Sequence, residues 1–445
     1  MTMRMKSVQA ALAMLAVVLV ARFAAGPAHA FSIQEITSPG GIKAWLVEDH
    51  TLPLIAMGFS VEGGSAVDPA GKEGLASFLG SMLDEGAGDL DSEGFRDRRD
   101  DLSARMSFEV HTDRFSGSFR TLTETRDASF DLFRLALTAP RFDAEPLERV
   151  RSQILLGITD DEQDPENIAF QSWRKKAFGS HPYGRSTRGT EEGVAAVQAA
   201  DLRNLAKNLL VRDTLTVAVV GDVDGATLGR LLDSTFGGLP ASGRIPAVAE
   251  ATMIRGPSLE VIERDIPQSI VQFGGPGLKR SDPDYMAAYV MNDMLGGSSF
   301  GARLTDEIRE RRGLTYSIGT DLLPFEHGSM FIGSAATRNE RVGETIELIR
   351  HELARFAEGG PTQEELDDAK TYVIGSYVLR FDTSERIADL LVGMQEQELG
   401  IDYMVKRESL IGALTIADIR RVAKRLIDSE RLIVTVVGKP AGLSP

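Results

Sequence analysis

The sequence has 445 residues, of which 42% are hydrophobic and 26% are charged, a composition that suits a folded chain of two or more domains. Its formal net charge of -16, without any long basic run, argues against binding to a nucleic-acid backbone. The chain contains no cysteine, so disulfides, thiol catalysis and cysteine-bound metals are excluded.

The first thirty residues have the pattern of a secretory signal peptide. Arg4 and Lys6 precede an apolar run over residues 10–20, and a terminal Ala-His-Ala supplies a cleavage site. A membrane anchor is the alternative, but Arg22 leaves the apolar run shorter than the roughly 20 residues that a spanning helix needs. We therefore expect removal of residues 1–30, export to the periplasm and no stable membrane insertion afterwards.

An internal repeat divides the rest of the chain into two halves. Residues 200–221 and 417–438 align without a gap, and 11 of the 22 aligned positions are identical. Each copy has the apolar spacing of an amphipathic helix, followed by the alternation of a strand. A Pro- and Gly-rich stretch over residues 239–257 reads as a linker. We therefore expect two homologous domains, at residues 31–238 and 258–445.

Helical and strand patterns alternate within both halves. Helical spacing covers residues 74–83, 143–159 and 285–295, and strand patterns cover residues 54–62, 106–110 and 270–273. This alternation predicts halves of the α/β or α+β class, in each of which helices back a sheet.

One phrase in the first half points to a known family. Residues 54–86 read LIAMGFSVEGGSAVDPAGKEGLASFLGSMLDEG, and similar family phrases occur at residues 181–185, 189–192 and 296–317. They resemble the inverted-motif zinc peptidases, the family of pitrilysin, insulysin and the mitochondrial processing peptidase, over nearly all of the chain after residue 30. The resemblance implies an α+β fold of two homologous halves, each a mixed, mainly antiparallel sheet backed by helices.

The family's zinc-binding residues are missing from this sequence. In the family, the helical motif H-x-x-E-H supplies two zinc ligands and a catalytic Glu. Ser77 and Ser81 stand at the two His positions, and Gly80 stands at the Glu position. The third ligand, a Glu on a later helix, falls by spacing on or beside Gly157, where no carboxylate is available. Serine is a poor zinc ligand and glycine has no side chain, so we expect no cofactor here and zinc only in a partner subunit.

A second family feature is present. Arg309 and Tyr316 match an Arg and a Tyr, seven residues apart, that active members carry in their C-terminal half. We expect Gly313 to end a helix over residues 302–312, and Tyr316 to alternate with the apolar side chains of a strand over residues 314–319. The resemblance implies that the pair binds substrate and stabilises the oxyanion of the scissile carbonyl. A solvated helix face with an ordinary strand tyrosine is the alternative.

Some bacterial relatives divide these features between two half-length subunits. The resemblance therefore implies a non-catalytic subunit of a heterodimeric periplasmic zinc peptidase, which delivers Arg309 and Tyr316 to a homologous zinc-bearing partner that cuts oligopeptides. Three alternatives stay open at this point. They are a structural subunit like the core subunits of the cytochrome bc complex, a stand-alone peptide-binding or chaperone module, and an autonomous peptidase with a rebuilt site.

Overall fold

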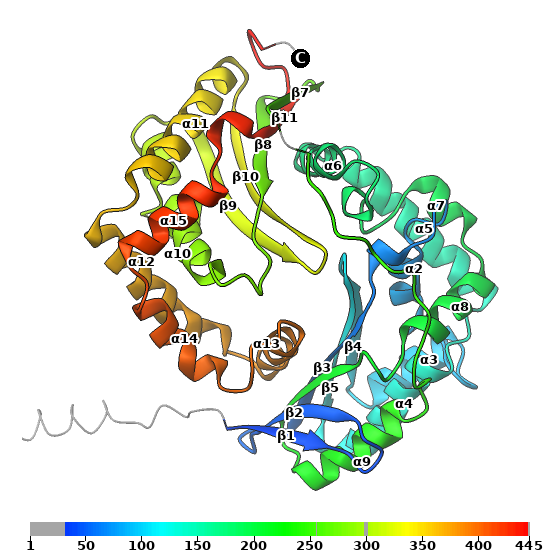
Figure 1. Ribbon diagram of the computed structural model, residues 1–445. Coiled ribbons are helices and arrows are strands. Elements are labelled where there is room, and N and C mark those ends of the chain that lie inside the picture. The colour runs from blue at the N-terminus through cyan, green and yellow to red at the C-terminus, as the bar shows by residue number, and fades with distance from the viewer. Residues whose placement is uncertain (1–31, 255, 298–300, 444–445) are drawn as a thin grey trace, which may run out of the picture.

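The computed structural model describes residues 32–254, 256–297 and 301–443, so the predicted signal peptide lies outside the described residues. The chain forms two sheets that line the inner sides of two halves, and most of the helices cover their outer sides (Figure 1). No helix within these ranges is both long enough and apolar enough to cross a membrane.

The first sheet has six strands, in the order β1-β2-β6-β3-β5-β4. The strands are β1 Ile33–Thr37, β2 Lys43–Glu48, β3 Leu54–Glu62, β4 Arg105–Val110, β5 Arg114–Leu122 and β6 Thr216–Gly221. β2 and β6 are parallel, and the other neighbouring pairs are antiparallel. The strand patterns predicted at residues 54–62 and 106–110 are therefore β3 and most of β4.

The second sheet repeats this arrangement with five strands, in the order β7-β11-β8-β10-β9. They are β7 Ser258–Glu263, β8 Gln268–Pro276, β9 Thr315–Phe325, β10 Gly328–Arg338 and β11 Ile433–Gly438. β7 and β11 are parallel, and the other neighbours are antiparallel. The two orders coincide when β2, β6, β3, β5 and β4 are matched with β7, β11, β8, β10 and β9. This match confirms the predicted α+β fold of two homologous halves.

Helices surround both sheets. Those before the linker are α2 Leu75–Met82, α3 Ser92–Asp101, α4 Arg126–Thr138, α5 Ala144–Asp161, α6 Pro165–Phe178, α7 Glu191–Ala196, α8 Ala199–Leu209 and α9 Gly225–Phe236. Those after it are α10 Tyr285–Gly296, α11 Val342–Gly359, α12 Gln363–Gly375, α13 Ser384–Glu396, α14 Tyr403–Gly412 and α15 Ile416–Leu426. Each half has its own large apolar core between its sheet and its outer helices.

Two helices cross from one half to the other, which the sequence patterns did not indicate. α6 packs on β11 and β8 of the second sheet, where Trp173 is fully buried and its Nε1 donates to the carbonyl of Ile433 at 2.9 Å. α13 packs on β3 and β6 of the first sheet, where Nε2 of Gln395 donates to the carbonyl of Val217 at 3.1 Å. Each half therefore covers the inner face of the other half's sheet with one of its helices.

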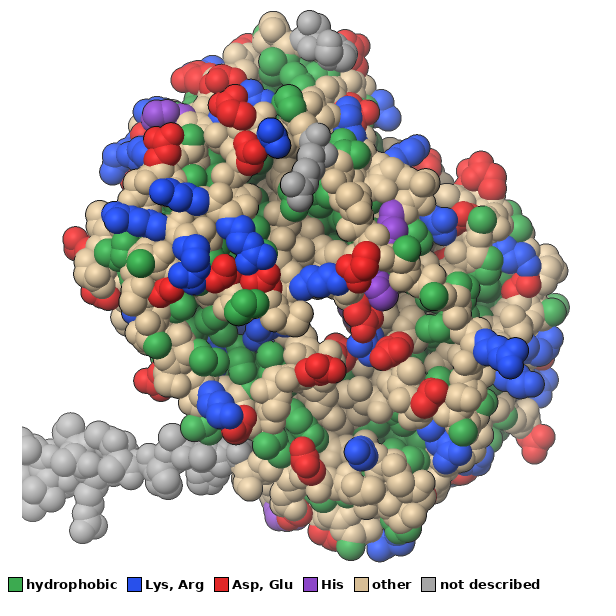
Figure 2. Space-filling model, in the orientation of Figure 1, with side chains coloured by type: hydrophobic (Ala, Val, Ile, Leu, Met, Phe, Trp, Pro, Cys, Tyr) green, Lys and Arg blue, Asp and Glu red, His purple; other side chains and the backbone are tan. Residues whose placement is uncertain are grey.

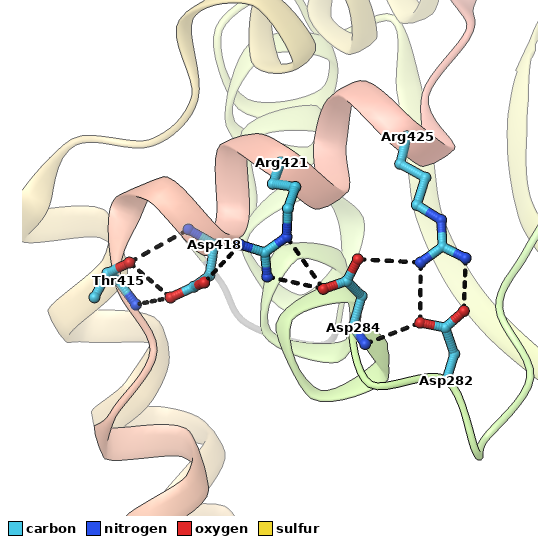
Figure 3. A network of polar contacts seen from close by, with 6 residues as sticks. All are labelled: Asp282, Asp284, Thr415, Asp418, Arg421 and Arg425. Carbon is cyan, nitrogen blue, oxygen red and sulfur yellow. Dashed lines mark hydrogen bonds and ion pairs between the residues drawn. The ribbon is translucent and has the colours of Figure 1, made fainter.

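The two copies of the internal repeat form α8 with β6 and α15 with β11, as the helix–strand prediction requires. In the second copy, α15 is tied to the start of α10 by a network of charges (Figure 3). Nη2 of Arg421 lies 2.8 Å from Asp284, and Nη2 of Arg425 lies 2.6 Å from Asp282. The hydrogen bond from Arg421 lowers the pKa of Asp284, and the one from Arg425 lowers the pKa of Asp282, so both carboxylates stay ionised.

Candidate functional site

The degenerate zinc motif lies on α2, where its side chains make ordinary protein contacts. The hydroxyl of Ser77 donates to the carbonyl of Thr187 at 2.7 Å, and that of Ser81 donates to the carbonyl of Ser77 at 3.1 Å. Gly80 is buried, and a Cβ added to it would lie 3.5 Å from Cγ2 of Val110. None of these three residues presents a zinc ligand.

A guanidinium occupies the place where the third ligand would extend. Gly157 lies on α5, and a Cβ added to it would lie 2.7 Å from Nη1 of Arg188. Nε of Arg188 lies 2.9 Å from Oδ2 of Asp161, which holds the side chain there. A permanent cation at this position repels a metal ion and offers it no lone pair. The residues that stand at the family's zinc-ligand positions on α2 and α5 therefore do not fit a zinc ion.

The loop that carries this guanidinium is pressed against the start of α2. Gly189 has φ 91°, and an added Cβ would lie 2.1 Å from the carbonyl oxygen of Glu73, so only glycine fits. On the other side, the carboxylate of Asp68 accepts hydrogen bonds from the backbone of Gly74 at 2.8 Å and of Ala76 at 2.9 Å. Burial raises the pKa of Asp68 to about 7 in spite of these two bonds. The start of α2 is thus fixed from both sides.

The second predicted site is a solvent-facing corner of the other half. The structure places Arg309 and Tyr316 together, with Cζ of the guanidinium 5.6 Å from the centroid of the ring. Tyr316 is 80% exposed and the Arg309 side chain is 40% exposed, with Nε 3.3 Å from a carboxylate oxygen of Glu310. The two side chains therefore form a solvent-facing cation–π pair.

The helix before this corner differs from the prediction. Residues 302–312 were expected to form an ordinary helix, but its main part is a π-helix, η4 (Thr305–Glu310). The amide of Arg311 donates to the carbonyl of Asp306 at 2.9 Å, five residues back, which widens the turn. Gly313 follows with φ 58° and donates to the carbonyl of Arg309 at 3.0 Å, as expected of a glycine that ends a helix.

The predicted strand alternation at Tyr316 is also wrong. The register of β9 against β10 shifts between Ala335 and Thr337, so Tyr316 and Ser317 lie opposite a single residue. Such a β-bulge re-aims the side chains beside it. Leu314 is buried in the core, whereas Tyr316 points to solvent. Sequence spacing alone could not reveal a bulge of one residue.

A cleft of about 450 Å³ lies between the first sheet, α13 and the hairpin of β9 and β10. Its wall on β4 and β5 is polar, with Ser107, Glu109, Ser116 and Ser118 facing the cleft. β4 is the outermost strand of its sheet, so one of its edges has no strand partner within the described ranges. The molecule also shows an opening between its two halves, bordered by acidic and basic side chains (Figure 2).

Comparison with known proteins places the chain in a family. The profile of insulinase, peptidase family M16, matches residues 43–191, and that of the peptidase M16 inactive domain matches residues 196–373. The chain belongs to peptidase family M16. The non-peptidase homolog YmxG of Helicobacter pylori is 26% identical to this M16 chain over 357 residues, which cover 80% of the chain and 82% of that protein. An uncharacterized zinc protease of Streptomyces coelicolor is 27% identical over 420 residues, covering 92% and 90%.

Solved structures agree with this assignment. A peptidase M16 inactive domain from Pseudomonas fluorescens superposes with a TM-score of 0.87 at 26% identity, covering 93% of the M16 chain and 99% of that chain. A protease from Helicobacter pylori (TM-score 0.83, 18% identity, 92% and 99% covered) and a chain of complex III2 from Candida albicans (0.75, 15%, 93% and 98%) share the fold. The inactive and non-peptidase relatives agree with the substituted motif: this M16 chain has no catalytic zinc site.

Within its described ranges, the M16 chain brings together one group of three metal-ligating side chains that the sequence analysis missed. Ligand atoms of Asp113, Glu326 and His327 lie within 4.8 Å of one another. The carboxylate of Asp113 already accepts from the hydroxyl of Tyr183 at 2.7 Å and from the backbone of Glu326 at 2.9 Å, and Arg114 donates to Glu326 at 2.7 Å. This group joins a hairpin turn of each half and acts as a polar joint.

Proposed function

We propose that this M16 chain is the non-catalytic, substrate-binding subunit of a heterodimeric zinc peptidase of the periplasm. It delivers Arg309 and Tyr316 to a homologous partner, whose intact H-x-x-E-H motif holds the zinc and cuts oligopeptides. The observation that carries the proposal is the contrast between the two corners. Arg188 occupies the space beside Gly157 where a zinc ligand would stand, whereas the Arg309–Tyr316 pair faces solvent and stands on a π-helix and a β-bulge, irregularities that recur at functional sites.

The chemistry of the pair suits this role. Hydrolysis of a peptide bond places negative charge on the carbonyl oxygen, which a phenol hydroxyl and a guanidinium stabilise by hydrogen bonds. Among the described residues, Arg309 forms an ion pair with Glu310 alone, an exposed contact of a kind worth about 0–1 kcal/mol, beside its solvent-facing cation–π contact with Tyr316. The guanidinium is therefore free to turn from Glu310 to a substrate at small cost.

An apolar surface supports the presence of a partner. Exposed hydrophobic side chains gather on α12, η6 (Ser376–Arg380) and α14, which contact one another. They are Tyr372, Val378, Leu379, Val405 and Leu410, which are 40% to 82% exposed. Apolar side chains grouped in this way commonly mark a surface that contacts another protein.

The polar cleft beside β4 favours an extended peptide as the substrate in this proposal. The free edge of β4 offers backbone donors and acceptors to an added peptide strand. The small polar side chains beside this edge would select little among the side chains of the bound peptide. In the closed dimer, such a peptide would lie within the chamber formed by the two subunits.

The test measures peptide hydrolysis by this chain, by a homologous subunit with an intact motif from the same cell, and by their mixture. We expect activity only in the mixture. Arg309→Ala or Tyr316→Phe should lower kcat/KM of the mixture by about 10² to 10³, the usual effect of losing an oxyanion donor. Arg311→Ala is the matched control, because Arg311 is 64% exposed on the same turn and pairs with Asp306.

Two results would contradict the proposal. Full activity of the zinc-bearing subunit alone would exclude a contribution of this chain. If Arg309→Ala lowers the rate of the mixture no more than Arg311→Ala does, the pair does not have the proposed role. Stable co-purification with a membrane complex, in the absence of any peptidase partner, would favour a structural subunit instead.

The proposed location has its own test. Protein recovered from the periplasmic fraction should begin at residue 31, as read by N-terminal sequencing. An intact N-terminus in the cytoplasmic fraction would overturn the export proposal without touching the role of Arg309.

A further inference from the structure

A cavity of about 310 Å³ in the second half is surrounded by aromatic and cationic side chains. It lies between α10, η6, α13 and α14. Four of the seven tyrosines in the chain line it: Tyr285, Tyr289, Tyr377 and Tyr403. Such a concentration of tyrosine around one small space calls for an explanation beyond packing.

Three arginines share this wall, and they lack acidic partners. Among the residues that the structure describes, Arg280, Arg380 and Arg407 form no ion pair with a carboxylate. Arg407 is only 5% exposed, and its Nη1 donates to the carbonyl of Val373 at 3.1 Å. Asp389 is the one acid among the residues that line the cavity. A buried cation without a counter-ion is costly, and a bound anion would remove that cost.

The tyrosine rings hold these guanidinium groups in place. Cζ of Arg407 lies 4.0 Å from the ring centroid of Tyr377, and Cζ of Arg280 lies 4.6 Å from that of Tyr285. Arg280 also donates from Nε to Oε1 of Gln397 at 3.0 Å and from Nη2 to the hydroxyl of Tyr403 at 2.8 Å, which leaves its Nη1 side for a ligand. A guanidinium that lies over a ring keeps its N–H edge available for a planar, two-pronged acceptor.

The rest of the lining is apolar. Met286, Leu390, Met394 and Leu399 complete the wall together with the faces of the tyrosines. The volume is near the lower end of the roughly 300–1000 Å³ of small-molecule sites, so one ring or branched chain with one anionic group fills it. The lining thus combines a cationic part with an apolar part in a space for one small group.

The geometry points to a binding site for a small organic carboxylate that carries an aromatic or branched apolar group. Arg407 and Arg280 bind the carboxylate, and Tyr289, Tyr377 and Leu390 contact the apolar part. The site belongs to this chain alone, so it holds whether or not the chain pairs with a peptidase.

Such a carboxylate has two possible sources. Asp389 and Gly393 line both this cavity and the 450 Å³ cleft beside the first sheet. The C-terminal residue of a peptide that lies in the cleft could therefore enter the cavity. A free carboxylic acid of the same size is the other source, and binding experiments separate the two.

The test uses isothermal titration calorimetry on the whole chain. The probes are N-acetyl-phenylalanine, its amide, and a Gly-Gly-Gly-Phe peptide with a free or an amidated C-terminus. We expect the free acids to bind with dissociation constants of order 1 mM or tighter, and the amides about tenfold more weakly or worse. Tighter binding of the peptide acid than of N-acetyl-phenylalanine would assign the site to peptide C-termini, and the reverse order would assign it to free acids.

Variants identify the cavity as the place of binding. Arg407→Gln and Arg280→Gln should each weaken binding of the acid by about tenfold, the loss of one charged hydrogen-bond partner. Arg386→Gln is the control, because Arg386 lies on α13, one of the helices around the cavity, but is 63% exposed, pairs with Asp382 and does not line the cavity. Thermal melting shows whether each variant is folded, and Arg280→Gln decides the question if Arg407→Gln does not fold.

Two results would overturn the proposal. One is equal binding of acid and amide, or no saturable binding of any acid at millimolar concentration. The other is binding by Arg280→Gln, and by folded Arg407→Gln, within twofold of the unmodified chain.

Discussion

The helix and strand of the repeat occur twice in the molecule, and the two copies hold different neighbours. In the first copy, Oδ1 of Asn208 on α8 accepts a hydrogen bond from the backbone of Arg244 in the linker at 3.1 Å. In the second copy, the equivalent position is Arg425, which binds Asp282 before α10 (Figure 3). Arg421 and Arg425, in place of Asn204 and Asn208, thus move the attachment of the helix from the linker to the start of another helix.

The positions that stay identical are those that the framework needs. Gly221 and Gly438 end the two equivalent strands with φ 138° and 150°. A Cβ added to either would lie 2.2 Å from a neighbouring oxygen, that of Leu54 in the first case and of Ser269 in the second. The common scaffold is therefore fixed by backbone sterics.

Between the framework elements, the halves are free to differ. In the first half, Arg188 occupies the space beside Gly157 where a zinc ligand would stand, and in the second half Arg309 and Tyr316 face solvent as a pair. The same fold thus carries one site that a guanidinium blocks and one whose side chains remain accessible. The next four experiments test that contrast, beginning with the largest expected effect.

The largest effect should come from restoring the zinc ligands on α2 and α5 and removing the cation beside them. Ser77→His, Ser81→His and Gly157→Glu restore the three ligand positions, and Arg188→Ala removes the cation beside residue 157. We expect the fourfold variant to bind one zinc per chain, and the threefold variant that keeps Arg188 to bind at least about tenfold more weakly, because its cation repels the metal and pairs with the new carboxylate. Zinc content after dialysis and calorimetric titration measure both.

Arg185→Ala in the threefold background is the matched control, because this arginine lies in the same loop and bonds the carbonyl of Asp68 instead. Equal zinc affinity of the variants with and without Arg188 would show that the guanidinium does not hinder zinc binding.

The second effect concerns the exchanged helices. Trp173→Ala on α6 and Leu391→Ala on α13 each remove a fully buried side chain from the sheet of the other half. We expect losses of about 3–5 kcal/mol for Trp173→Ala and about 2–5 kcal/mol for Leu391→Ala in the free energy of unfolding. Urea unfolding followed by circular dichroism measures them. Leu156→Ala, at an exposed position, is the control. If Trp173→Ala or Leu391→Ala lowers the free energy of unfolding as little as Leu156→Ala does, the packing of α6 and α13 on the opposite sheets does not stabilise the fold.

The third prediction concerns Asp201 and Asp418, which occupy equivalent positions in the two copies of the repeat. Bonds from the Thr415 side chain and backbone and from Arg421 lower the pKa of Asp418 to about 2. Burial raises the pKa of Asp201, but its interactions with Lys72 and its bond from the backbone of Gln198 together outweigh burial and leave the pKa lowered. Because these folded-state pKa values are depressed, the stabilisation is present above the ordinary value of 3.8 and is lost below it, for Asp418 down to about pH 2.

We therefore expect Asp418→Asn to cost about 1 kcal/mol at pH 7, the typical value of a capping residue, and Asp201→Asn about half as much. Both differences should shrink when urea unfolding is repeated at pH 3. A cost of Asp418→Asn that grows on acidification would contradict this assignment.

The sequence was sufficient for the framework and for the loss of zinc, since both depend on local patterns. Alternating valines mark β6 and β11, and the substituted motif is visible without coordinates. The sequence was insufficient wherever contacts are distant. Arg188 reaches Gly157 across 31 positions, and Arg280 meets Tyr403 across 123. The bulge that turns Tyr316 outward depends on one extra residue of β9, which no periodicity reports.

The smallest effect should be on stability at the open corner. Tyr316→Phe removes a hydroxyl from a side chain that is 80% exposed, so we expect a change within about 0.5 kcal/mol in the free energy of unfolding. Tyr183→Phe is the matched comparison. Its ring is buried and its hydroxyl bonds Asp113 and the backbone of His327, so its loss should cost about 1–3 kcal/mol. A Tyr316→Phe variant as unstable as Tyr183→Phe would mean that this tyrosine supports the fold, and any loss of activity in the mixture could then no longer be assigned to chemistry.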